Sequence, residues 1–524
     1  MKEESTEPID SRPPSGHAAA GRLAPSRVDP DAKAPLYRQI YDGLRLDILA
    51  GALRPGQRLA STRAMAQELG VSRNTVLEAI DQLTAEGYLV GRAGSGTFVT
   101  DRLPDDLLRT ALPGREAPAA GPDIARRGHQ YRQWAQASRS ERARPFQLGR
   151  PAVDRFPWPL WWRLSAKRGR TVSPEWLDYS PSAGYPPLRR ALADYLRRSR
   201  GLACSPEQIL IVRGSQQGLD LAARVLLDPG DAVWMEDPGY GAAEVAFAAG
   251  GARLVRVPVD KDGLDVDAGR RLEPAARLAY VTPSHQYPLG VTLSLARRLR
   301  LLEWARSAGA WVVEDDYDSE YRYEGRPLAS LAGLDGGGTV IYLGTLSKVL
   351  FPALRLGYLV VPEAHLDAFV GARYASDRHT SILEQAVVAD FLDGGHFDRH
   401  IRRMRVLYAE RQAALADAAG SYLGGALDLQ SSPTGLHDVG WLGPGLDDRR
   451  VAAAAAERGV FVGALSNYGH RPMPPALLFG YAGFPAESLR RATEDLARVL
   501  DGLGDSSRAI GAAPRIGPSA SRGP

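Results

Sequence analysis

Cysteine, net charge and long apolar runs are all scarce in this sequence. Among its 524 residues only Cys204 is a cysteine, which excludes an intrachain disulfide framework and is typical of a reducing environment. The net charge is +4, so any nucleic-acid binding must come from local patches of cations. No run approaches the ~18 apolar residues of a membrane span. Residues 1–10 are acidic and polar, without the apolar region of a signal peptide. We therefore expect a cytoplasmic protein with no membrane partner.

Lysine is largely replaced by arginine. The chain has 65 lysine and arginine residues, and its lysines are Lys2, Lys33, Lys167, Lys261 and Lys348. Arginine keeps its proton near neutral pH and cannot attack an aldehyde, whereas burial lowers the pKa of a lysine and favours an imine. Lys348 alone lies in an apolar stretch flanked by Ser and Thr, after the β-rich run 340–343. It is therefore the candidate for a Schiff base.

Composition divides the chain into five parts. The two ends are rich in Pro, Gly, Ser and Ala, which is typical of disorder. One internal stretch returns to Pro, Gly, Ala and Arg and is predicted to be a linker with a helical stretch near its end. The longest part alternates strand and helix patterns, the signature of an α/β domain. The predicted boundaries are a tail at 1–33, a small domain at 34–101, a linker at 102–143, the α/β domain at 144–503 and a tail at 504–524.

The small domain carries a helix-turn-helix pattern. Met65 and Leu69 lie one helical turn apart, and Gly70 then ends the helix. Ser72 is a good N-cap for a second helix, whose apolar residues recur at i, i+4 and i+7 over 76–83. Arg73, Asn74 and Thr75 lie at the start of that helix, where recognition helices contact the major groove.

A hairpin wing is predicted after the second helix. Residues 87–90 and 96–99 alternate as strands around a glycine-rich turn. Arg92 in this wing can reach a minor groove or a phosphate, and Arg63 opens the earlier helix. Because acidic and basic residues nearly balance, a winged helix that binds protein remains an alternative.

This domain resembles the GntR-type winged helix. The residues that carry the resemblance are the runs 35–37, 59–63, 69–76 and 94–99. The resemblance implies that a double-stranded DNA operator is contacted by Arg63, Ser72, Arg73, Asn74, Thr75 and the wing residues Gly94, Gly96 and Thr97.

Several short motifs of the large domain precede Lys348. Residues 212–218 follow an apolar run and open a helix, so backbone N–H groups there can hold a phosphate. An ordinary strand-to-helix turn without a ligand has the same sequence pattern. Tyr240 follows another strand and can stack on a flat ring, although most such tyrosines simply pack. His285, in the polar loop 282–290, is by itself more typical of a loop histidine.

An acidic run, 314–320, follows a buried strand. One carboxylate held there can keep a pyridine nitrogen protonated, which makes pyridoxal phosphate an electron sink. A solvated acidic loop and a metal site are the alternatives, and the absence of nearby His/Cys ligand spacing disfavours a metal. Thr345, Ser347 and Arg355 surround Lys348, and two hydroxyls with a guanidinium suit a phosphate.

Together these motifs resemble fold type I aminotransferases, and with the winged helix they resemble the MocR subfamily of GntR regulators over nearly the whole chain. The implied fold is an α/β domain with a mostly parallel sheet and flanking helices, plus an N-terminal α+β winged helix. The resemblance also implies pyridoxal phosphate as the cofactor. Its expected residues are Lys348 for the Schiff base, Asp315 for the pyridine nitrogen, Tyr317 for the ring hydroxyl, Tyr240 for stacking, Ser215, Gln216, Thr345, Ser347 and Arg355 for the phosphate, and His285 or Gln286 near the ring oxygen or the substrate.

The charged run 395–405 also matches this subfamily, but we can assign it no chemistry and interpret it as a helix at a domain contact. Two positions depart from amino-acid-binding relatives. Leu478 stands where fold type I aminotransferases have an arginine for the substrate carboxylate, and Ala242 stands where some amino-acid sensors have another. Arg471 lies near in sequence and is a candidate substitute.

These departures favour a regulator over an enzyme. We expect a homodimeric, pyridoxal-phosphate-dependent transcriptional regulator that controls vitamin B6 or amine and amino-acid metabolism, with at most a residual transamination half-reaction. Its effector is expected to be pyridoxal phosphate itself, or the Schiff base with an amine whose anionic end is bound elsewhere. The alternatives are an active aminotransferase with an accessory DNA-binding module and a scaffold with a vestigial cofactor pocket.

Overall fold

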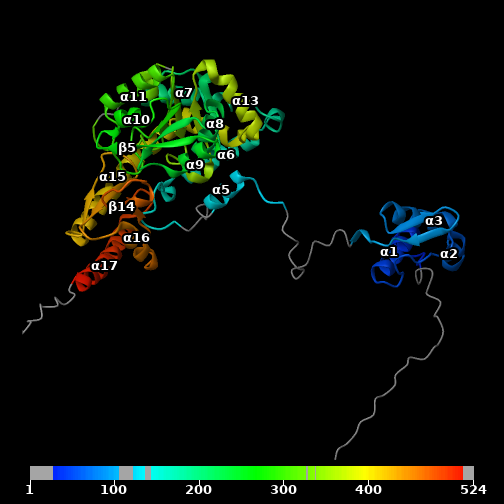
Figure 1. The fold of residues 1–524 in the computed structure, drawn as a ribbon. Coiled ribbons are helices and arrows are strands. Elements are labelled where there is room, and N and C mark those ends of the chain that lie inside the picture. The colour runs from blue at the N-terminus through cyan, green and yellow to red at the C-terminus, as the bar shows by residue number, and fades with distance from the viewer. Residues whose placement is uncertain (1–27, 106–121, 136–142, 326–328, 337, 512–524) are drawn as a thin grey trace, which may run out of the picture. The chain divides into compact units, whose positions relative to one another are not determined.

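The computed structural model describes residues 28–105, 122–135, 143–325, 329–336 and 338–511. The chain forms two compact units that divide after Asp123 (Figure 1). Each unit has a hydrophobic core of its own, as expected for separate domains.

The first unit is a three-helix module with a two-stranded hairpin. Its elements are α1 (Leu36–Leu49), α2 (Thr62–Leu69), α3 (Arg73–Ala85), β1 (Leu89–Arg92) and β2 (Gly96–Val99). The apolar positions predicted for the two helices are buried, with Met65, Val76 and Leu83 at 0% exposure. The predicted helix-turn-helix and wing are therefore confirmed.

Local chemistry explains where these helices begin and end. Ser61 Oγ accepts a hydrogen bond from Ala64 N at 3.2 Å, and Ser72 Oγ accepts one from Thr75 N at 3.1 Å. Each hydroxyl satisfies an N–H group that the first helical turn leaves without a partner. Gly70 ends α2 in the left-handed region, with φ of 69°, which glycine adopts at little cost.

Three of the predicted boundaries need correction. Residues 102–105 belong to the small domain and not to the linker, because Leu103 packs on its core and Asp105 pairs with Arg45 at 3.2 Å. Residues 28–33 belong to the folded module, because Gln39 Nε2 donates to Asp29 O at 2.9 Å and Val28 packs on the module core. Helix α17 (Ala486–Gly511) continues beyond residue 503, since extending a helix costs far less than starting one. The remaining tail predictions, for 1–27 and 512–524, lie outside the described residues. Within the predicted linker, α5 (Arg126–Ala135) is helical as expected.

The second unit is built on an eight-stranded sheet in the order β3-β10-β9-β8-β7-β4-β5-β6. The strands β5, β4, β7, β8 and β9 run parallel, and β10 is antiparallel to both of its neighbours. The strands are β3 (Ile209–Val212), β4 (Ala232–Asp237), β5 (Arg253–Asp260), β6 (Gly263–Leu264), β7 (Leu278–Val281), β8 (Trp311–Asp316), β9 (Val340–Thr345) and β10 (Gly357–Val360). The predicted α/β domain with a mostly parallel sheet is confirmed.

Helices cover both faces of this sheet (Figure 1). Side chains alternate between the faces along each strand: in β9, Ile341 and Leu343 join one core cluster and Tyr342 joins the other. Helices α8, α9 and α13 pack on the Ile341 face, and α7, α11, α14 and α15 pack on the Tyr342 face. The helices are α6 (Trp158–Arg170), α7 (Pro186–Arg200), α8 (Ser215–Leu226), α9 (Gly241–Ala249), α10 (Val266–Leu272), α11 (Leu295–Ala308), α12 (Leu331–Asp335), α13 (Leu366–Asp377), α14 (Ile382–Asp393) and α15 (His396–Tyr422).

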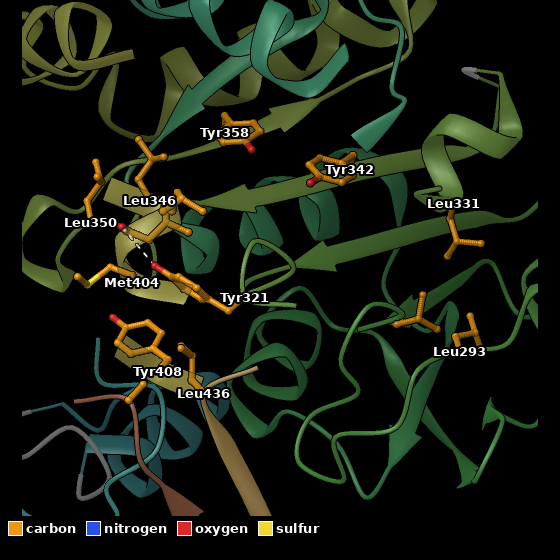
Figure 2. Close-up of a cluster of buried hydrophobic side chains, with 14 of the residues drawn as sticks. Leu293, Tyr321, Leu331, Tyr342, Leu346, Leu350, Tyr358, Met404, Tyr408 and Leu436 are labelled. Atoms are coloured by element: carbon orange, nitrogen blue, oxygen red, sulfur yellow. Dashed lines mark hydrogen bonds between the residues drawn. The ribbon is translucent and has the colours of Figure 1, made fainter. Parts of the chain in front are cut away.

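A smaller antiparallel sheet follows in the order β11-β12-β14-β13. Its elements, with the helix between them, are β11 (Leu427–Gln430), β12 (His437–Leu442), α16 (Asp448–Glu457), β13 (Gly463–Ala464) and β14 (Ala476–Gly480). Apolar packing continues from the large sheet to this part of the unit: Tyr321, Met404 and Tyr408 meet Leu346 and Leu436 in one cluster (Figure 2). The Tyr321 hydroxyl also donates to the carbonyl of Lys348 at 3.4 Å, so this cluster supports the backbone at that lysine.

Among the described residues, no helix is long and apolar enough to cross a membrane. The described part of the chain also contains no group of three or more His, Cys, Asp or Glu side chains arranged to hold a metal ion.

Candidate functional site

A cavity of about 300 Å³ lies at the carboxyl ends of β4, β7, β8 and β9. Ligands of α/β domains bind at this end of parallel strands. The lining residues are Leu148, Gly149, Ser215, Tyr240, Tyr280, Thr282, Tyr287, Asp315, Tyr317, Thr345, Ser347, Lys348, Pro352, Arg355, Leu436 and His437. Eight of the eleven residues named for the cofactor or substrate are in this set. The three that are not are Gln216, His285 and Gln286, and Gln286 Nε2 donates to the carbonyl of Pro238 at 2.9 Å.

Lys348 follows β9 and presents its amine to this cavity. Its Nζ donates to the carbonyl of Gly149 at 2.8 Å. Burial lowers the pKa of the amine, and the carboxylate of Asp318 partly opposes that shift. Gly149 has a φ of 67°, and a Cβ there would come within 2.6 Å of Nζ. Glycine at this position therefore leaves room for the lysine head group.

Asp315 lies at the end of β8, within the strand and not in a solvated loop. Its Oδ2 accepts from the Tyr280 hydroxyl at 2.8 Å, and its Oδ1 is buried without a hydrogen-bond partner among the described residues. Burial raises the pKa of Asp315 to about 7. The site therefore contains a buried oxygen that can accept a proton from a ligand.

The other carboxylates of the acidic run have structural partners. Glu314 accepts from the backbone N–H groups of Leu331 and Ala332, each at 2.9 Å. Asp316 is 2.7 Å from a guanidinium nitrogen of Arg200. Because neighbouring residues of a strand face opposite sides, only Asp315 of this group lies on the cavity side of β8. The solvated-loop reading of this run is therefore wrong.

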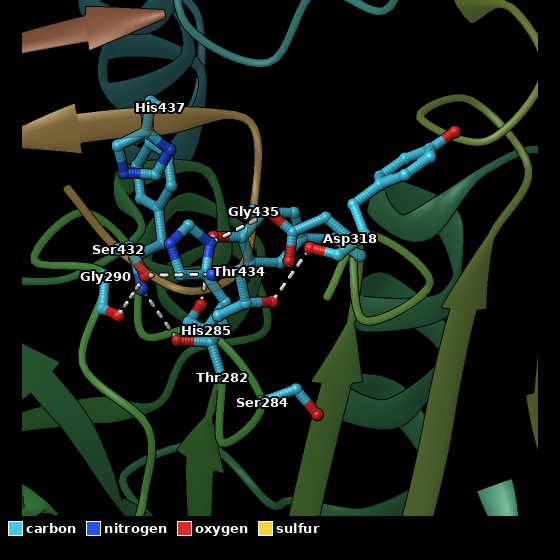
Figure 3. Close-up of polar contacts among 12 residues, drawn as sticks. Thr282, Ser284, His285, Gly290, Asp318, Ser432, Thr434, Gly435 and His437 are labelled. Atoms are coloured by element: carbon cyan, nitrogen blue, oxygen red, sulfur yellow. Dashed lines mark hydrogen bonds and ion pairs between the residues drawn. The ribbon is translucent and has the colours of Figure 1, made fainter. Parts of the chain in front are cut away.

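His285 contacts the Tyr317 hydroxyl and does not line the cavity. Figure 3 shows the His285 ring near the ring of His437. The Nδ1 of His285 is 2.9 Å from Asp318 Oδ2 and 2.9 Å from the Tyr317 hydroxyl. The neighbouring His437 does line the cavity, and burial lowers its pKa to about 3. His285 thus holds Tyr317, whereas the histidine at the cavity wall is one that the sequence did not indicate.

Four of the five expected phosphate-binding residues line the same cavity, namely Ser215, Thr345, Ser347 and Arg355. Ser215 is the first residue of α8, where backbone N–H groups favour an anion. Ser347 Oγ is buried without a partner among the described residues. Gly214 has a φ of 78°, and a Cβ there would come within 3.4 Å of the Arg355 guanidinium. Gln216 points elsewhere and donates to the carbonyl of Ala242 at 3.0 Å.

Aromatic side chains form another wall. Tyr240 immediately precedes α9, and its ring meets Tyr287 edge-on with centroids 5.5 Å apart. Sequence reasoning missed Tyr287 together with Tyr280, Thr282 and the pairs 148–149 and 436–437. Tyr280 carried a weak signal, a polar tip in an otherwise apolar strand. Residues 148–149 and 436–437 carried no signal in the sequence, because they reach the cavity from distant parts of the chain.

The departures from amino-acid-binding relatives are visible in the structure. Leu478 lies in β14, fully buried in a cluster with Val439, Leu465 and Ala476. Arg471 is 3.5 Å from Asp237 Oδ2 and donates to a backbone carbonyl at 3.0 Å, and it does not line the cavity. Among the described residues that line the cavity, Arg355 is the one guanidinium. A second bidentate clamp for a substrate carboxylate is therefore lacking in the described cavity wall.

The first unit displays the side chains predicted to contact DNA. Arg63, Ser72, Arg73, Asn74 and Arg92 are exposed, and so are Gly94 and Gly96, while Thr75 and Thr97 are half-buried. Arg73 Nε donates to Thr62 Oγ1 at 3.3 Å, which joins the starts of α2 and α3. The Arg92 guanidinium lies 4.7 Å from the centroid of the Phe98 ring.

Comparison with known proteins assigns a family to both units. Residues 36–99 match the family of bacterial regulatory proteins called gntR, and residues 155–496 match aminotransferase class I and II. The chain is 41% identical to the probable rhizopine catabolism regulatory protein MocR of Rhizobium meliloti, over 92% of this chain and 97% of that protein. The chain belongs to the MocR subfamily of GntR-type transcriptional regulators.

The chain is also similar to a second regulator and, in its large domain, to a solved aminotransferase structure. The pyridoxine biosynthesis transcriptional regulator PdxR of Corynebacterium glutamicum is 32% identical over 91% of this chain and 98% of its own length. The crystal structure of LysN, an α-aminoadipate aminotransferase of Thermus thermophilus, has a TM-score of 0.64 and 32% identity, covering 69% of this chain and 92% of that one.

The cavity fits the cofactor of that fold. A buried amine, an unpartnered carboxylate oxygen and a hydroxyl with a guanidinium match the aldehyde, the pyridine nitrogen and the phosphate of pyridoxal phosphate. This MocR-type protein is therefore a pyridoxal-phosphate-dependent DNA-binding transcriptional regulator.

Proposed function

We propose that the large domain senses pyridoxal phosphate, or its condensation product with an amine, and that occupancy changes operator binding by the winged helix. The observation that carries this proposal is the placement of Lys348, a buried amine in a cavity with Asp315 and Arg355, on a chain with a GntR domain. An effector shifts binding only if it favours one conformational state over another.

The side chains of the cavity would divide the work of holding the cofactor. The cofactor supplies an aldehyde that an uncharged amine attacks, and the lowered pKa of Lys348 increases its uncharged fraction. Asp315 Oδ1 would accept the proton of the pyridine nitrogen. Arg355, with Ser215, Thr345 and Ser347, would hold the phosphate. Tyr240 would pack on the ring.

Three further residues would act around these. Tyr317, which lines the cavity, would form a hydrogen bond with the ring hydroxyl. His285, paired with Asp318, would fix the Tyr317 side chain. Gln216 would fix the first turn of α8 against the Ala242 carbonyl and so support Ser215. Both of these are positioning roles.

The effector class follows from the missing clamp. With Leu478 in the core and Arg471 away from the cavity wall, nothing in the described cavity matches an α-carboxylate apart from Arg355, which the phosphate would use. This favours pyridoxal phosphate itself, or an amine that needs no carboxylate contact. Control of vitamin B6 or amine metabolism is consistent with the names of the two regulators.

A homodimer would suit the DNA-binding half of this function. Two winged helices would read two half-sites of one operator, as in other dimeric regulators. Sedimentation of the full chain, alone and with operator DNA, tests this part. A monomer that binds the operator with one-to-one stoichiometry would contradict it.

An active aminotransferase is the second candidate. The complete set of Lys348, Asp315 and Arg355, and the likeness to LysN, favour it. The two functions separate when the purified protein is incubated with pyridoxal phosphate, an amino acid and a keto acid. Product formation at about 1 s⁻¹ or faster would favour the enzyme.

The regulator predicts a different result in the same preparation. Pyridoxal phosphate should give a visible absorbance band that borohydride reduction fixes to the protein, and operator affinity should change when the cofactor is added. A preparation that binds its operator identically with and without the cofactor would contradict the sensor.

A further inference from the structure

A second polar cavity of about 230 Å³ lies away from the cofactor site, where the end of α7 meets the segment after β8 and the start of α15. The charged run 395–405 contributes residues to the lining of this cavity and none to the lining of the cofactor cavity. The polar side chains that matter here are Arg200, Ser319, Glu320, Asp398, Arg402 and Arg405.

This cavity contains buried donors without partners. Arg200 is 6% exposed and Ser319 is 9% exposed, and both line the cavity. Arg200 uses one guanidinium nitrogen for Asp316, at 2.7 Å, and for Ser284, at 2.9 Å. Its Nε, and the Oγ of Ser319, have no hydrogen-bond partner in the part of the chain that the structure describes. Buried donors of this kind are normally satisfied, so a ligand that accepts hydrogen bonds would fit.

Helix α15 adds charges of both signs. Asp398, Arg402 and Arg405 recur at i, i+4 and i+7, which places them on one side of the helix. Arg405 Nε donates to the backbone carbonyl of Glu320, so its terminal nitrogens remain for other contacts. Arg402 is exposed and has no ion pair or hydrogen bond with any residue that the structure describes. Its guanidinium is therefore available to a carboxylate.

The acidic groups lie in the same cavity. Glu320 Oε1 accepts from the Tyr195 hydroxyl at 2.6 Å, and Asp398 is exposed at the helix start. A cavity with arginines alone would suit a simple anion. Carboxylates beside the arginines penalise such an anion and favour a ligand that also carries a positive charge.

We propose that this cavity binds a free amino acid, whose carboxylate contacts Arg402, Arg405 and the unpartnered donors of Arg200 and Ser319, and whose ammonium group contacts Asp398 and Glu320. The guanidinium fork suits a carboxylate. The cavity has what the cofactor site lacks, which is a clamp for a carboxylate.

The strand β8 separates the two sites. Asp315 faces the cofactor cavity, and its neighbour Asp316 faces the other way and pairs with Arg200. The amino-acid site thus lies on the opposite side of the sheet from the cofactor and does not depend on the proposed sensing reaction. Failure of one proposal leaves the other standing.

Calorimetric titration of the cofactor-loaded full chain tests the site. The probes are glycine, L-alanine, L-serine and L-glutamine, with acetate and methylamine as compounds that carry only one of the two charges. At least one amino acid should bind, and both single-charge compounds should bind tenfold more weakly or worse. Arg402→Gln should weaken the amino acid tenfold or more and leave the cofactor absorbance unchanged.

Two variants locate the binding. Arg399→Gln is the matched control, because Arg399 lies on α15 outside the cavity and donates to the carbonyl of Gly394, and it should bind like the parent. Lys348→Ala without pyridoxal phosphate should also bind the amino acid, which separates this site from condensation with the cofactor's aldehyde. Loss of all binding in Lys348→Ala, undiminished binding in Arg402→Gln, or acetate binding equal to that of the amino acids would each overturn the proposal. No binding at millimolar concentration would do so as well.

Discussion

The two units place their functional side chains in opposite environments. The winged helix carries its predicted DNA-contacting residues on the surface, within the short stretches 63–75 and 92–97. The cofactor cavity is enclosed by residues from Leu148 to His437, and its central groups are Asp315, which is buried, and Lys348, which is half-buried. The first surface is local in sequence, and the second exists only once a large fold has formed.

The two kinds of site differ in how much they reduce the stability of the folded protein. Exposed arginines keep their water until DNA arrives, so they place little strain on folding. A buried amine and a buried carboxyl must shed water during folding, which opposes their charged forms. Substitution of an exposed arginine in the first unit should therefore alter binding alone, whereas substitution of a cavity residue in the second unit should alter both binding and stability.

The largest expected effect is in the second unit. Lys348→Ala removes the buried amine, so borohydride should no longer fix pyridoxal phosphate to the protein, and the operator should no longer respond to the cofactor. Binding of operator DNA by the cofactor-free protein should remain. Mass spectrometry after reduction and fluorescence anisotropy with operator DNA measure the two properties.

Lys167→Ala is the matched control for this change, since Lys167 is an exposed lysine in the last turn of α6. It should retain both the reducible adduct and the operator response. If the Lys348→Ala protein still responds to pyridoxal phosphate, Lys348 is not the residue through which the cofactor acts on operator binding.

The next effect concerns pH and the stability of the cofactor-free second unit. Burial raises the pKa of Asp315 to about 7, above its unfolded value near 3.9. The group therefore stabilises the fold fully below about pH 4, and this contribution is lost as the pH rises through about 7. The loss is on the order of 4 kcal/mol. Asp315→Asn has no such proton to lose, so its stability should fall less over this range.

Tryptophan fluorescence during urea unfolding can measure how the stability of the second unit changes with pH, because all nine tryptophans lie in that unit. The difference between parent and variant is the useful quantity. Burial lowers the pKa of His400 to about 4 and of His437 to about 3, and these groups change stability in the opposite direction. Asp267→Asn, at an exposed carboxylate of α10, should track the parent. Identical pH profiles for the parent and Asp315→Asn would contradict the buried-carboxyl argument.

The same contrast explains how much could be predicted from the sequence. Local signals sufficed where neighbours in sequence are neighbours in space: the cap at Ser72 and the glycine that ends α2 were both predicted from the sequence. The alternation of strands and helices likewise indicated the α/β domain, because each element is marked by its own periodicity.

The residues that could not be predicted are those that long-range packing brings to the cavity or turns away from it. Gly149 and His437 reach the cavity from the chain before α6 and from β12, and no local pattern marks them. His285 and Gln216 were expected to contact the cofactor or its substrate, yet the structure turns them toward Asp318 and the Ala242 carbonyl. The acidic run looked uniform, and only the pairing of β8 with its neighbours separates Asp315 from Asp316.

A smaller effect is expected at the DNA-binding surface. Arg73→Ala should weaken specific operator binding by about 1–3 kcal/mol, because an arginine at the start of a recognition helix can donate to guanine. The Trp-monitored unfolding of the second unit should not change. Anisotropy with operator and scrambled DNA separates specific from general binding. Equal losses on both DNAs would reassign Arg73 from base to phosphate contact.

The smallest effect tests whether a cap can also be a DNA contact. Ser61 and Ser72 cap α2 and α3 in the same way, so replacement of either by alanine should destabilise the module by about 1 kcal/mol. Amide hydrogen exchange in α2 and α3 measures this loss. Only Ser72 was predicted to touch DNA, so Ser72→Ala should also lose operator affinity beyond what Ser61→Ala loses. If the two variants weaken operator binding equally, the hydroxyl of Ser72 only caps the helix, and the DNA contacts of α3 begin at Arg73.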